Sequence, residues 1–225
     1  MAAAIRRAFP GRREGIFAPE GPGINVRGDR DGNGADVDGV FETPAAVRDA
    51  AVLVPLVDRP EGMTVLLTQR SVHLAAHGGQ ISFPGGRVEP EDTDAVATAL
   101  RETEEEVGLS PTQVEVVGRL DTYHTRTGFR VVPVVGLVSP PFFLQPDPFE
   151  VQEVFEVPLA FILDPGSRQR QSREFKGAQR SFWVFPYNER YIWGATAGML
   201  VNLCDVLGVP HMTPEGRMDF HPPRP

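Results

Sequence analysis

Hydrophobic residues along this chain follow two periods, which predict different kinds of secondary structure. Residues 50–57 form an apolar run rich in β-branched side chains, and residues 63–70 form a second one. Both runs predict strands, and the short turn at residues 58–62 allows them to pair as a hairpin. Residues 94–107 carry apolar side chains three and four positions apart, which predicts an amphipathic helix.

The predicted helix has a recognisable start and end. Asp92 or Thr93 is suited to the N-cap, Asp94 falls in the first turn, and Gly108 is the expected C-terminal stop. Its apolar stripe consists of Val96, Ala99, Leu100, Thr103 and Val107.

The remaining elements alternate between strands and helices without a repeat. Short helices are predicted at residues 45–49 and 160–163, and a longer one at residues 191–207. Further strands are predicted at 114–120, 130–138 and 150–157, and a pair of strands within 173–186. Pro133 indicates that the strand at 130–138 is an edge strand or contains a bulge. This mixed order indicates an α+β domain with a mixed sheet between helices.

The two ends of the chain differ in composition from its centre. Gly, Pro, Arg and Asp dominate residues 11–43, where no period holds, so we expect residues 1–44 to be a flexible N-terminal extension. Residues 29–34 resemble half of a calcium-binding loop, but Val40 stands where the closing glutamate would be needed, and we interpret the segment as a turn. The domain itself is expected at residues 45–208, with a tail at 209–225.

Composition and charge exclude several classes of protein. Of the 225 residues, 41% are hydrophobic, which is enough for a sizeable core. The net charge of −8 argues against a general nucleic-acid binder. No apolar stretch has the length of a membrane helix, and no apolar core follows the arginines near the N-terminus, so we expect no secretory signal. Cys204 is the one cysteine, so we expect a reducing, cytoplasmic setting and a small buried hydrophobe at that position.

Three glutamates of the predicted helix, Glu102, Glu105 and Glu106, fall on one face and repel one another. Such a cluster is either a solvated surface or a site for a hard divalent cation such as Mg²⁺ or Mn²⁺. The segment 83–86, Phe-Pro-Gly-Gly, favours the cation, because a glycine turn lets the backbone approach a ligand closely.

These residues resemble the Nudix box of hydrolases that act on nucleoside-diphosphate derivatives. The box reads G-x5-E-x7-R-E-U-x-E-E-x-G-U, with U apolar, and is matched here from Gly86 to Leu109. The longer run from Leu66 to Glu102 resembles the coenzyme A diphosphatase branch of that superfamily. One extra residue lies between Gly86 and Arg101, a spacing that this branch shares, so the isolated acid of the box falls on Asp92 or on Thr93.

The resemblance implies a Nudix α/β/α sandwich and a set of ligands for the metal. Glu102, Glu105 and Glu106, together with a backbone carbonyl at Gly86, would hold Mg²⁺ or Mn²⁺. Arg101 would orient a carboxylate. A further acid is needed as a base or a ligand, and we favour Glu150 over the two other candidates, Glu153 and Glu156.

Residues for substrate binding are predicted nearby, mostly within the branch-like run. Arg70 and Arg87 offer guanidinium groups to phosphate oxygens, and Ser71, His77 and Gly85 lie beside them in the sequence. For His77 a structural role is equally compatible with the sequence. An aromatic ring at Tyr187 or Trp193 could stack on adenine, but core packing is the role that we expect for Trp193.

The resemblance therefore predicts metal-dependent hydrolysis of coenzyme A or acyl-coenzyme A to 3′,5′-ADP and (acyl-)4′-phosphopantetheine. Another nucleoside diphosphate derivative, such as ADP-ribose or a dinucleotide, is the main alternative. A non-catalytic nucleotide sensor is disfavoured, because all three glutamates of the box are present. The expected partner is this small-molecule substrate, with no nucleic acid and no membrane. The sequence leaves the oligomeric state open, a homodimer included.

Overall fold

The computed structural model describes residues 1–9, 26–28, 47–74, 78–175, 178–209, 211–212 and 218–219. The predicted calcium-like turn at residues 29–34 lies outside these ranges, and so does His77. The domain boundaries at residues 44 and 208 stay predictions.

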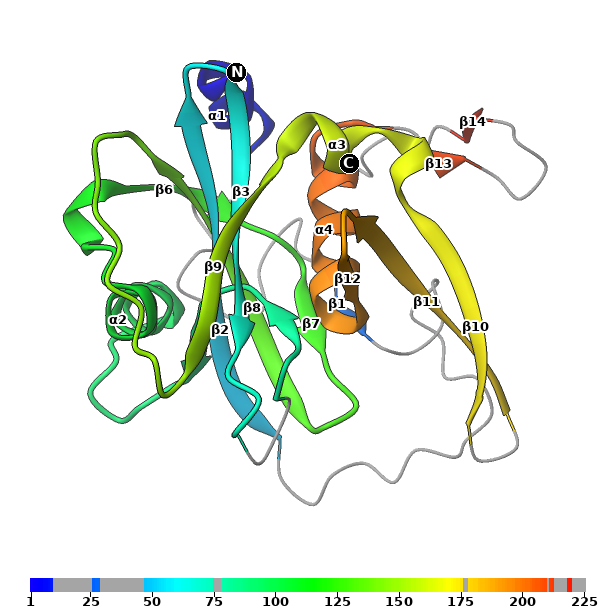
Figure 1. The fold of residues 1–225 in the computed structure, drawn as a ribbon, viewed down its shortest axis with the longest axis horizontal. Helices are drawn as coiled ribbons and strands as arrows, with labels where there is room; N and C mark the ends of the chain where they lie inside the picture. The colour runs from blue at the N-terminus through cyan, green and yellow to red at the C-terminus, as the bar shows by residue number, and fades with distance from the viewer. Residues whose placement is uncertain are drawn as a thin grey trace.

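Four long strands form the centre of a mixed sheet (Figure 1). Strand β2 (Arg48–Arg59) pairs antiparallel with β3 (Gly62–Arg70) on one side and parallel with β8 (Phe129–Val138) on the other. Strand β9 (Val151–Pro158) pairs antiparallel with β3. The predicted β2–β3 hairpin is thus confirmed, and the near-continuous burial of both strands agrees with their apolar sequences.

Shorter strands complete this sheet around the four long ones. The three nearest the predicted helix are β4 (Ile81–Ser82) on β3, β5 (Gly85–Arg87) on β2, and β6 (Val114–Arg119) on β8. Strand β7 (Thr122–His124) follows β6 along β8 and pairs in parallel with β1 (Val26–Gly28). A turn of 3₁₀ helix, η1 (Pro111–Gln113), leads into β6.

Two helices cover opposite faces of the sheet, as Figure 1 shows for α2 (Ala95–Val107) and α4 (Gly194–Val206). On the α2 side, Ala99 and Val107 pack with Leu53 and Leu66 in one hydrophobic cluster. On the α4 side, a larger cluster contains alternate residues of the same strands and the helix residues Leu200, Leu203 and Cys204. This arrangement is the predicted α+β sandwich, with two separate cores on a mixed sheet.

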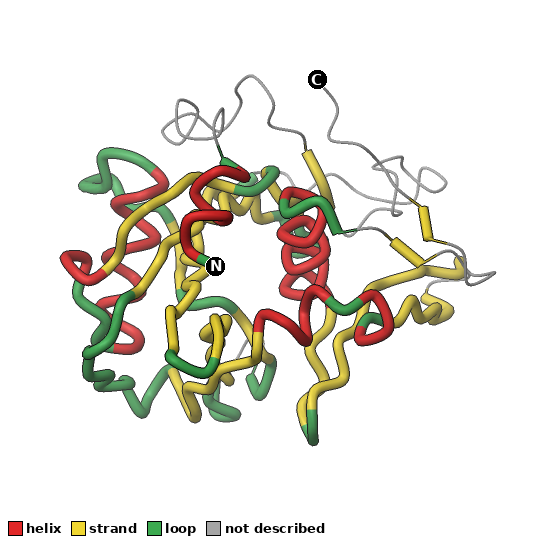
Figure 2. The backbone as a smooth tube through the Cα atoms, turned by 90° about the horizontal axis from the view of Figure 1, so that it is seen from above, coloured by secondary structure: helices red, strands yellow, loops and turns green. Residues whose placement is uncertain are grey.

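The C-terminal part adds a second, three-stranded antiparallel sheet beside α4 (Figure 2). Its strands are β10 (Gln169–Phe175), β11 (Ala178–Tyr187) and β12 (Arg190–Trp193). Helix α3 (Leu159–Leu163) and the turn η2 (Pro165–Ser167) connect the two sheets. The strands β13 (His211–Met212) and β14 (Met218–Asp219) pair with each other.

Three local predictions are corrected by the structure. A short helix was predicted at residues 45–49. This prediction is wrong for residues 48 and 49, because β2 begins at Arg48. The long C-terminal helix starts at Gly194 rather than at residue 191, because residues 190–193 pair with β11. Pro133 lies in the central strand β8, opposite the break between β6 and β7, where its missing N–H interrupts no pairing with β6.

The limits of α2 are set by its caps. Asp94, rather than Asp92 or Thr93, is the N-cap, and its Oδ1 accepts the N–H groups of Val96 and Ala97 at 2.8 and 2.9 Å. Gly108 ends the helix in the left-handed conformation with φ of 74°, as predicted.

The first nine residues pack on the core, although they were predicted to be part of a flexible extension. Helix α1 (Ala2–Ala8) buries Ile5, and the following Phe9 is fully buried. The ring of Phe9 packs on Gly118 so closely that a Cβ there would lie 2.8 Å from it. Two apolar residues among arginines and alanines are too few to create a detectable period, which is why the sequence did not reveal this helix.

The described helices and the cysteine bear on two further expectations, a membrane span and a buried thiol. None of their helices has the length and apolar character needed to cross a membrane. Cys204 is fully buried, as predicted, and its Sγ donates to the carbonyl oxygen of Ile162. Burial raises the pKa of this thiol to about 12.

Replacement of Phe9 by Ala should destabilise the protein by about 3–5 kcal/mol, because it empties a fully buried site. Urea unfolding followed by circular dichroism measures this change. Phe143→Ala is the matched control, since that side chain is 86% exposed and its loss should cost less than about 0.5 kcal/mol. Equal midpoints for the two variants would contradict the placement of the first nine residues in the core.

Candidate catalytic centre

The Gly85–Gly86 backbone at the start of β5 is held against β2 at a distance that only glycine permits. Gly85 has φ of 146°, and a Cβ on it would lie 2.4 Å from the carbonyl oxygen of Ala51 and 2.5 Å from Cα of Val52. The Gly85 N–H points at helix α2, where it donates to Oε2 of Glu106 at 3.0 Å.

Glu106 is a buried carboxylate with two partners. Its side chain is 4% exposed, and Oε1 accepts a hydrogen bond from Nη1 of Arg70 at 3.3 Å. The pKa of Glu106 is raised to about 7, chiefly by burial and also by the charges of Glu150 and Glu102, against the opposing effects of Gly85 and Arg70. The negative charge of Glu106 is therefore costly here unless additional positive charge is supplied.

Glu102 lies directly beside Gly86. A Cβ on Gly86 would fall 2.3–2.6 Å from the carboxylate atoms of Glu102, so the backbone and the carboxylate share a space that excludes any side chain at residue 86. Burial is the largest cause that raises the pKa of Glu102, and the charges of Glu105 and Glu150 add to it, against the lowering effect of Arg101. Glu102 and Glu106 are thus both placed among like charges.

Arg101 joins the acidic residues of this region. Its Nε and Nη2 donate to the two carboxylate oxygens of Asp92, both at 2.9 Å, and its Nη1 donates to Glu102 at 3.1 Å and Glu105 at 3.0 Å. Nη2 also reaches the carbonyl oxygen of Arg87 at 3.2 Å. One guanidinium group thereby fixes the start of α2 and its acidic face relative to β5.

Asp92 occupies the position that the box assigns to its isolated acid. Besides Arg101, it accepts hydrogen bonds from the N–H of Glu89 and the hydroxyl of Thr98, both at 2.9 Å. The guanidinium of Arg101 is the largest cause that lowers the pKa of Asp92. The sequence left Asp92 and Thr93 open for this position, and of the two it is Asp92 whose carboxylate pairs with Arg101.

Three acids after residue 149 are candidates for the base or a further ligand. Among the described residues, Glu150 is the one of the three that lies next to α2. The Ser71 N–H donates to its backbone carbonyl at 2.8 Å, and its charge contributes to the raised pKa of both Glu102 and Glu106. Glu153 instead pairs with Arg190, and Glu156 pairs with Arg59 and Thr64.

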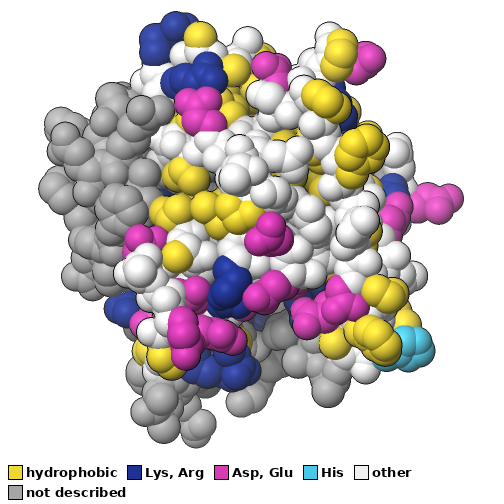
Figure 3. All heavy atoms as spheres, turned by 90° about the vertical axis from the view of Figure 1, so that its left-hand side faces the viewer, with side chains coloured by type: hydrophobic (Ala, Val, Ile, Leu, Met, Phe, Trp, Pro, Cys, Tyr) yellow, Lys and Arg dark blue, Asp and Glu magenta, His cyan; other side chains and the backbone are white. Residues whose placement is uncertain are grey.

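The predicted substrate residues divide into two groups. Arg70, Ser71 and Gly85 surround Glu106 and Glu150 through the contacts described above. The guanidinium of Arg87 lies 5.6 Å from the centre of the Phe129 ring. Among the described contacts, Arg87 is joined to the acidic face through its backbone carbonyl, which accepts from Arg101. Figure 3 shows the side of the molecule to which α2 belongs, where acidic and basic side chains are interleaved beside apolar ones.

The donor set of this region suits a hard divalent cation, since it consists of carboxylate oxygens beside a glycine backbone. Within the part of the chain that the structure describes, no three His, Cys, Asp or Glu side chains are already arranged to hold a metal ion. Arg101 occupies one oxygen of Glu102 and one of Glu105 in this arrangement. Glu105 is 59% exposed and can turn without repacking the core.

Comparisons with known proteins show which family this chain resembles in sequence. The family model described as NUDIX domain matches residues 47–189. The "Uncharacterized Nudix hydrolase NudL" of Escherichia coli O6:H1 is 44% identical over 162 residues, covering 72% of this chain and 84% of that protein. Its namesake from Shigella flexneri serotype 5b is 43% identical, covering 74% and 86%. A solved Ap4A hydrolase complex from C. elegans is 25% identical with a TM-score of 0.44, covering 49% of this chain and 80% of that one.

Asp92→Asn should lower the free energy of unfolding by about 2–4 kcal/mol at pH 7, because it removes the charge that holds a largely buried guanidinium. Denaturant unfolding measures the loss. The lowered pKa means that the ionised Asp92 contributes fully above the unfolded pKa of about 4. The difference from the parent protein should therefore shrink as the pH falls below that value.

Asp94→Asn is the matched control for this prediction. The change is chemically identical and lies two residues away, but asparagine keeps the capping oxygen of Asp94 and should cost only a few tenths of a kcal/mol. A destabilisation by Asp94→Asn as large as that by Asp92→Asn would contradict the role assigned to the Asp92–Arg101 pair.

Proposed function

The chain belongs to the NUDIX family, and we propose that it hydrolyses the diphosphate bond of coenzyme A or acyl-coenzyme A. The products are 3′,5′-ADP and (acyl-)4′-phosphopantetheine. Membership of the family supports the coarser part of this statement, a hydrolase of nucleoside diphosphate derivatives. The choice of coenzyme A rests on the run from Leu66 to Glu102, which resembles that branch.

One observation carries the catalytic part of the proposal. The carboxylate of Glu106 is buried beside Glu102 and Glu150 and its pKa is raised to about 7, while Gly85 and Arg70 supply only part of the positive charge that it needs. A buried carboxylate with a perturbed pKa is typical of a functional site rather than of a solvated surface.

We assign the metal to Glu102, Glu105, Glu106 and the carbonyl of Gly86, with Mg²⁺ or Mn²⁺ as the ion. When bound, the ion neutralises phosphate charge and lowers the pKa of a water molecule. Arg70 is placed to donate to a phosphate oxygen as well as to Glu106, which would orient the diphosphate.

Glu150 is assigned the role of base. It would accept a proton from the attacking water while the water oxygen bonds to phosphorus and the anhydride P–O bond breaks, so that the second phosphate leaves with the electron pair. Its backbone is fixed through Ser71, next to Arg70, which keeps the base and the phosphate contact together.

The alternatives share the same centre and differ in the substrate. ADP-ribose or a dinucleotide would present the same diphosphate to Glu106 and Arg70, and a sensor would bind it without turnover. The intact set of glutamates favours turnover. In every case the partner is a small nucleotide derivative, and the setting proposed is the cytoplasm.

Glu105→Gln and Glu106→Gln should each lower kcat by about 10²-fold or more with Mg²⁺ or Mn²⁺, because each removes a charged ligand for the ion. The release of 3′,5′-ADP from coenzyme A measures this effect. Glu104→Gln is the matched control, since Glu104 is exposed on the same helix and outside the assigned ligands. Mn²⁺ binding followed by electron paramagnetic resonance should weaken in the two site variants alone, and unchanged binding and turnover would contradict the metal assignment.

A substrate panel tests the choice of coenzyme A. At equal concentrations, kcat/KM should be highest for coenzyme A or an acyl-coenzyme A among substrates that include ADP-ribose and diadenosine polyphosphates. A higher value for a substrate without pantetheine would refute the coenzyme A assignment while leaving the metal site intact.

A further inference from the structure

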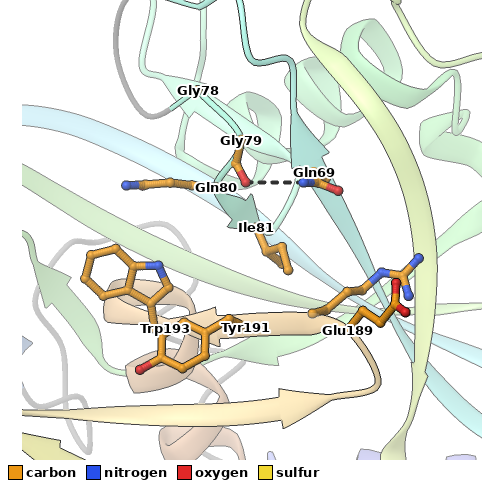
Figure 4. A pocket seen from close by; sticks show the side chains of 9 residues that line it. Gln69, Gly78, Gly79, Gln80, Ile81, Glu189, Tyr191 and Trp193 are labelled. Carbon is orange, nitrogen blue, oxygen red and sulfur yellow. Dashed lines mark hydrogen bonds between the residues drawn. The ribbon is translucent and has the colours of Figure 1, made fainter.

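A cavity of about 270 Å³ lies on the α4 side of β3, separate from the carboxylates of α2 (Figure 4). One wall is the loop that joins β3 to β4, and the other is the hairpin of β11 and β12. The side chains used below are Gln69, Gln80, Glu189, Arg190, Tyr191 and Trp193. Ligand pockets range from roughly 300 to 1,000 Å³, so this cavity suits one ring system rather than a whole dinucleotide.

The cavity and the candidate catalytic centre share the end of β3. Successive side chains of a strand point to opposite faces, so Arg70 contacts Glu106 on one side while Gln69 lines the cavity on the other. The backbone of Arg70 is tied to the loop of the cavity by hydrogen bonds with Gln80 at 2.9 Å and Gly79 at 3.0 Å. A group bound in the cavity would therefore lie against the segment that positions Arg70.

Two aromatic residues of β12 provide an open but fixed surface. Tyr191 and Trp193 are two positions apart, hence on one face of the strand, and are 45% and 42% exposed. The indole of Trp193 packs edge-on against Phe182 with centroids 5.9 Å apart, and the hydroxyl of Tyr191 donates to Gln171 at 2.6 Å. Rings that are held in place yet exposed are suited to stack on a planar ligand.

Polar groups around these rings offer both donors and acceptors. Figure 4 shows the side chain of Gln80 extending across the opening above Trp193. Gln69 also lines the cavity, and its Nε2 donates to the carbonyl oxygen of Gly79 over a long distance of 3.4 Å. Nε of Arg190 is buried and has no hydrogen-bond partner among the described residues. Glutamine amides match the edge of an adenine, which presents an acceptor next to a donor.

The charges around the cavity do not favour a phosphate. Arg190 is already paired with Glu153 and lies 4.3 Å over the ring of Phe155, and Glu189 adds a negative charge to the lining. An anion would meet one neutralised arginine and one carboxylate. A neutral, flat and hydrogen-bonding group is the better match.

We propose that this cavity binds the heteroaromatic base of a nucleoside, stacked on Trp193 with its polar edge toward Gln80 and Gln69. The inference rests on the proposed function in one respect, namely that the substrate carries such a base. Coenzyme A, ADP-ribose and adenine dinucleotides all carry one. It places base recognition on the opposite face of the sheet from the diphosphate chemistry.

Tryptophan fluorescence provides a direct test, because the chain contains two tryptophans, Trp183 and Trp193. In the full-length Trp183→Phe variant the emission reports Trp193 alone. Adenosine should quench it saturably, whereas pantetheine and pyrophosphate should not. In the Trp193→Phe variant, which reports Trp183, adenosine should have no saturable effect. Gln80→Ala in the Trp183→Phe background should weaken adenosine binding several-fold.

Kinetics provides a readout that is independent of fluorescence. Trp193→Ala should raise KM for an adenine-containing substrate by about 10-fold with little change in kcat, and Trp193→Phe should restore most of the loss because it keeps a ring. If adenosine leaves the Trp193 emission unchanged, or if pantetheine quenches it equally, the inference is overturned. Quenching by adenosine in a protein that fails to hydrolyse coenzyme A would uphold the cavity and refute the proposed function.

Discussion

The contact of the Gly85–Gly86 backbone with β2 and α2 is the constraint on which the candidate centre depends. Gly85 fits against Ala51 and Val52 only without a side chain, and Gly86 meets the carboxylate of Glu102 in the same way. This close approach lets one backbone N–H reach Glu106 inside the protein. Without it, α2 would lie farther from β5, and its glutamates would face solvent as ordinary surface charges.

The electrostatics of α2 follow from that contact. Glu106 is buried and Glu102 is half-buried among like charges, and both have raised pKa values, whereas the pKa of Asp92 is lowered by Arg101. One arginine therefore satisfies the acid at the start of the helix and contacts two acids farther along it. The charge left uncompensated is concentrated at Glu106, close to Arg70 and Glu150, where a phosphate and a cation would meet.

Much of the fold could be predicted because its signals are local. The apolar runs of β2 and β3 and the stripe of α2 are continuous in the sequence, and Gly108 ends the helix as its type suggests. Asp94 was mistaken for a first-turn residue because Asp92, Thr93 and Asp94 are all suitable N-caps. The choice among them depends on Arg101, which pairs with the carboxylate of Asp92, while Asp94 caps the helix. Residues 191–193 were assigned to a helix because their pairing with β11 is a contact between segments that the local pattern does not show. The cavity beside Trp193 had no single local pattern, since its walls come from segments about a hundred residues apart in the sequence.

The parallel pairing of β2 with β8 has a consequence for how the chain folds during synthesis. The β2–β3 hairpin can form as soon as both strands leave the ribosome, but the other edge of β2 is covered only when β8 follows, after α2, β6 and β7. At roughly 5–20 residues per second, that edge and its apolar faces wait on the order of ten seconds for their partner. A nascent chain with such a long-range contact at its centre should depend on chaperones more than a protein of equal size built from neighbouring hairpins.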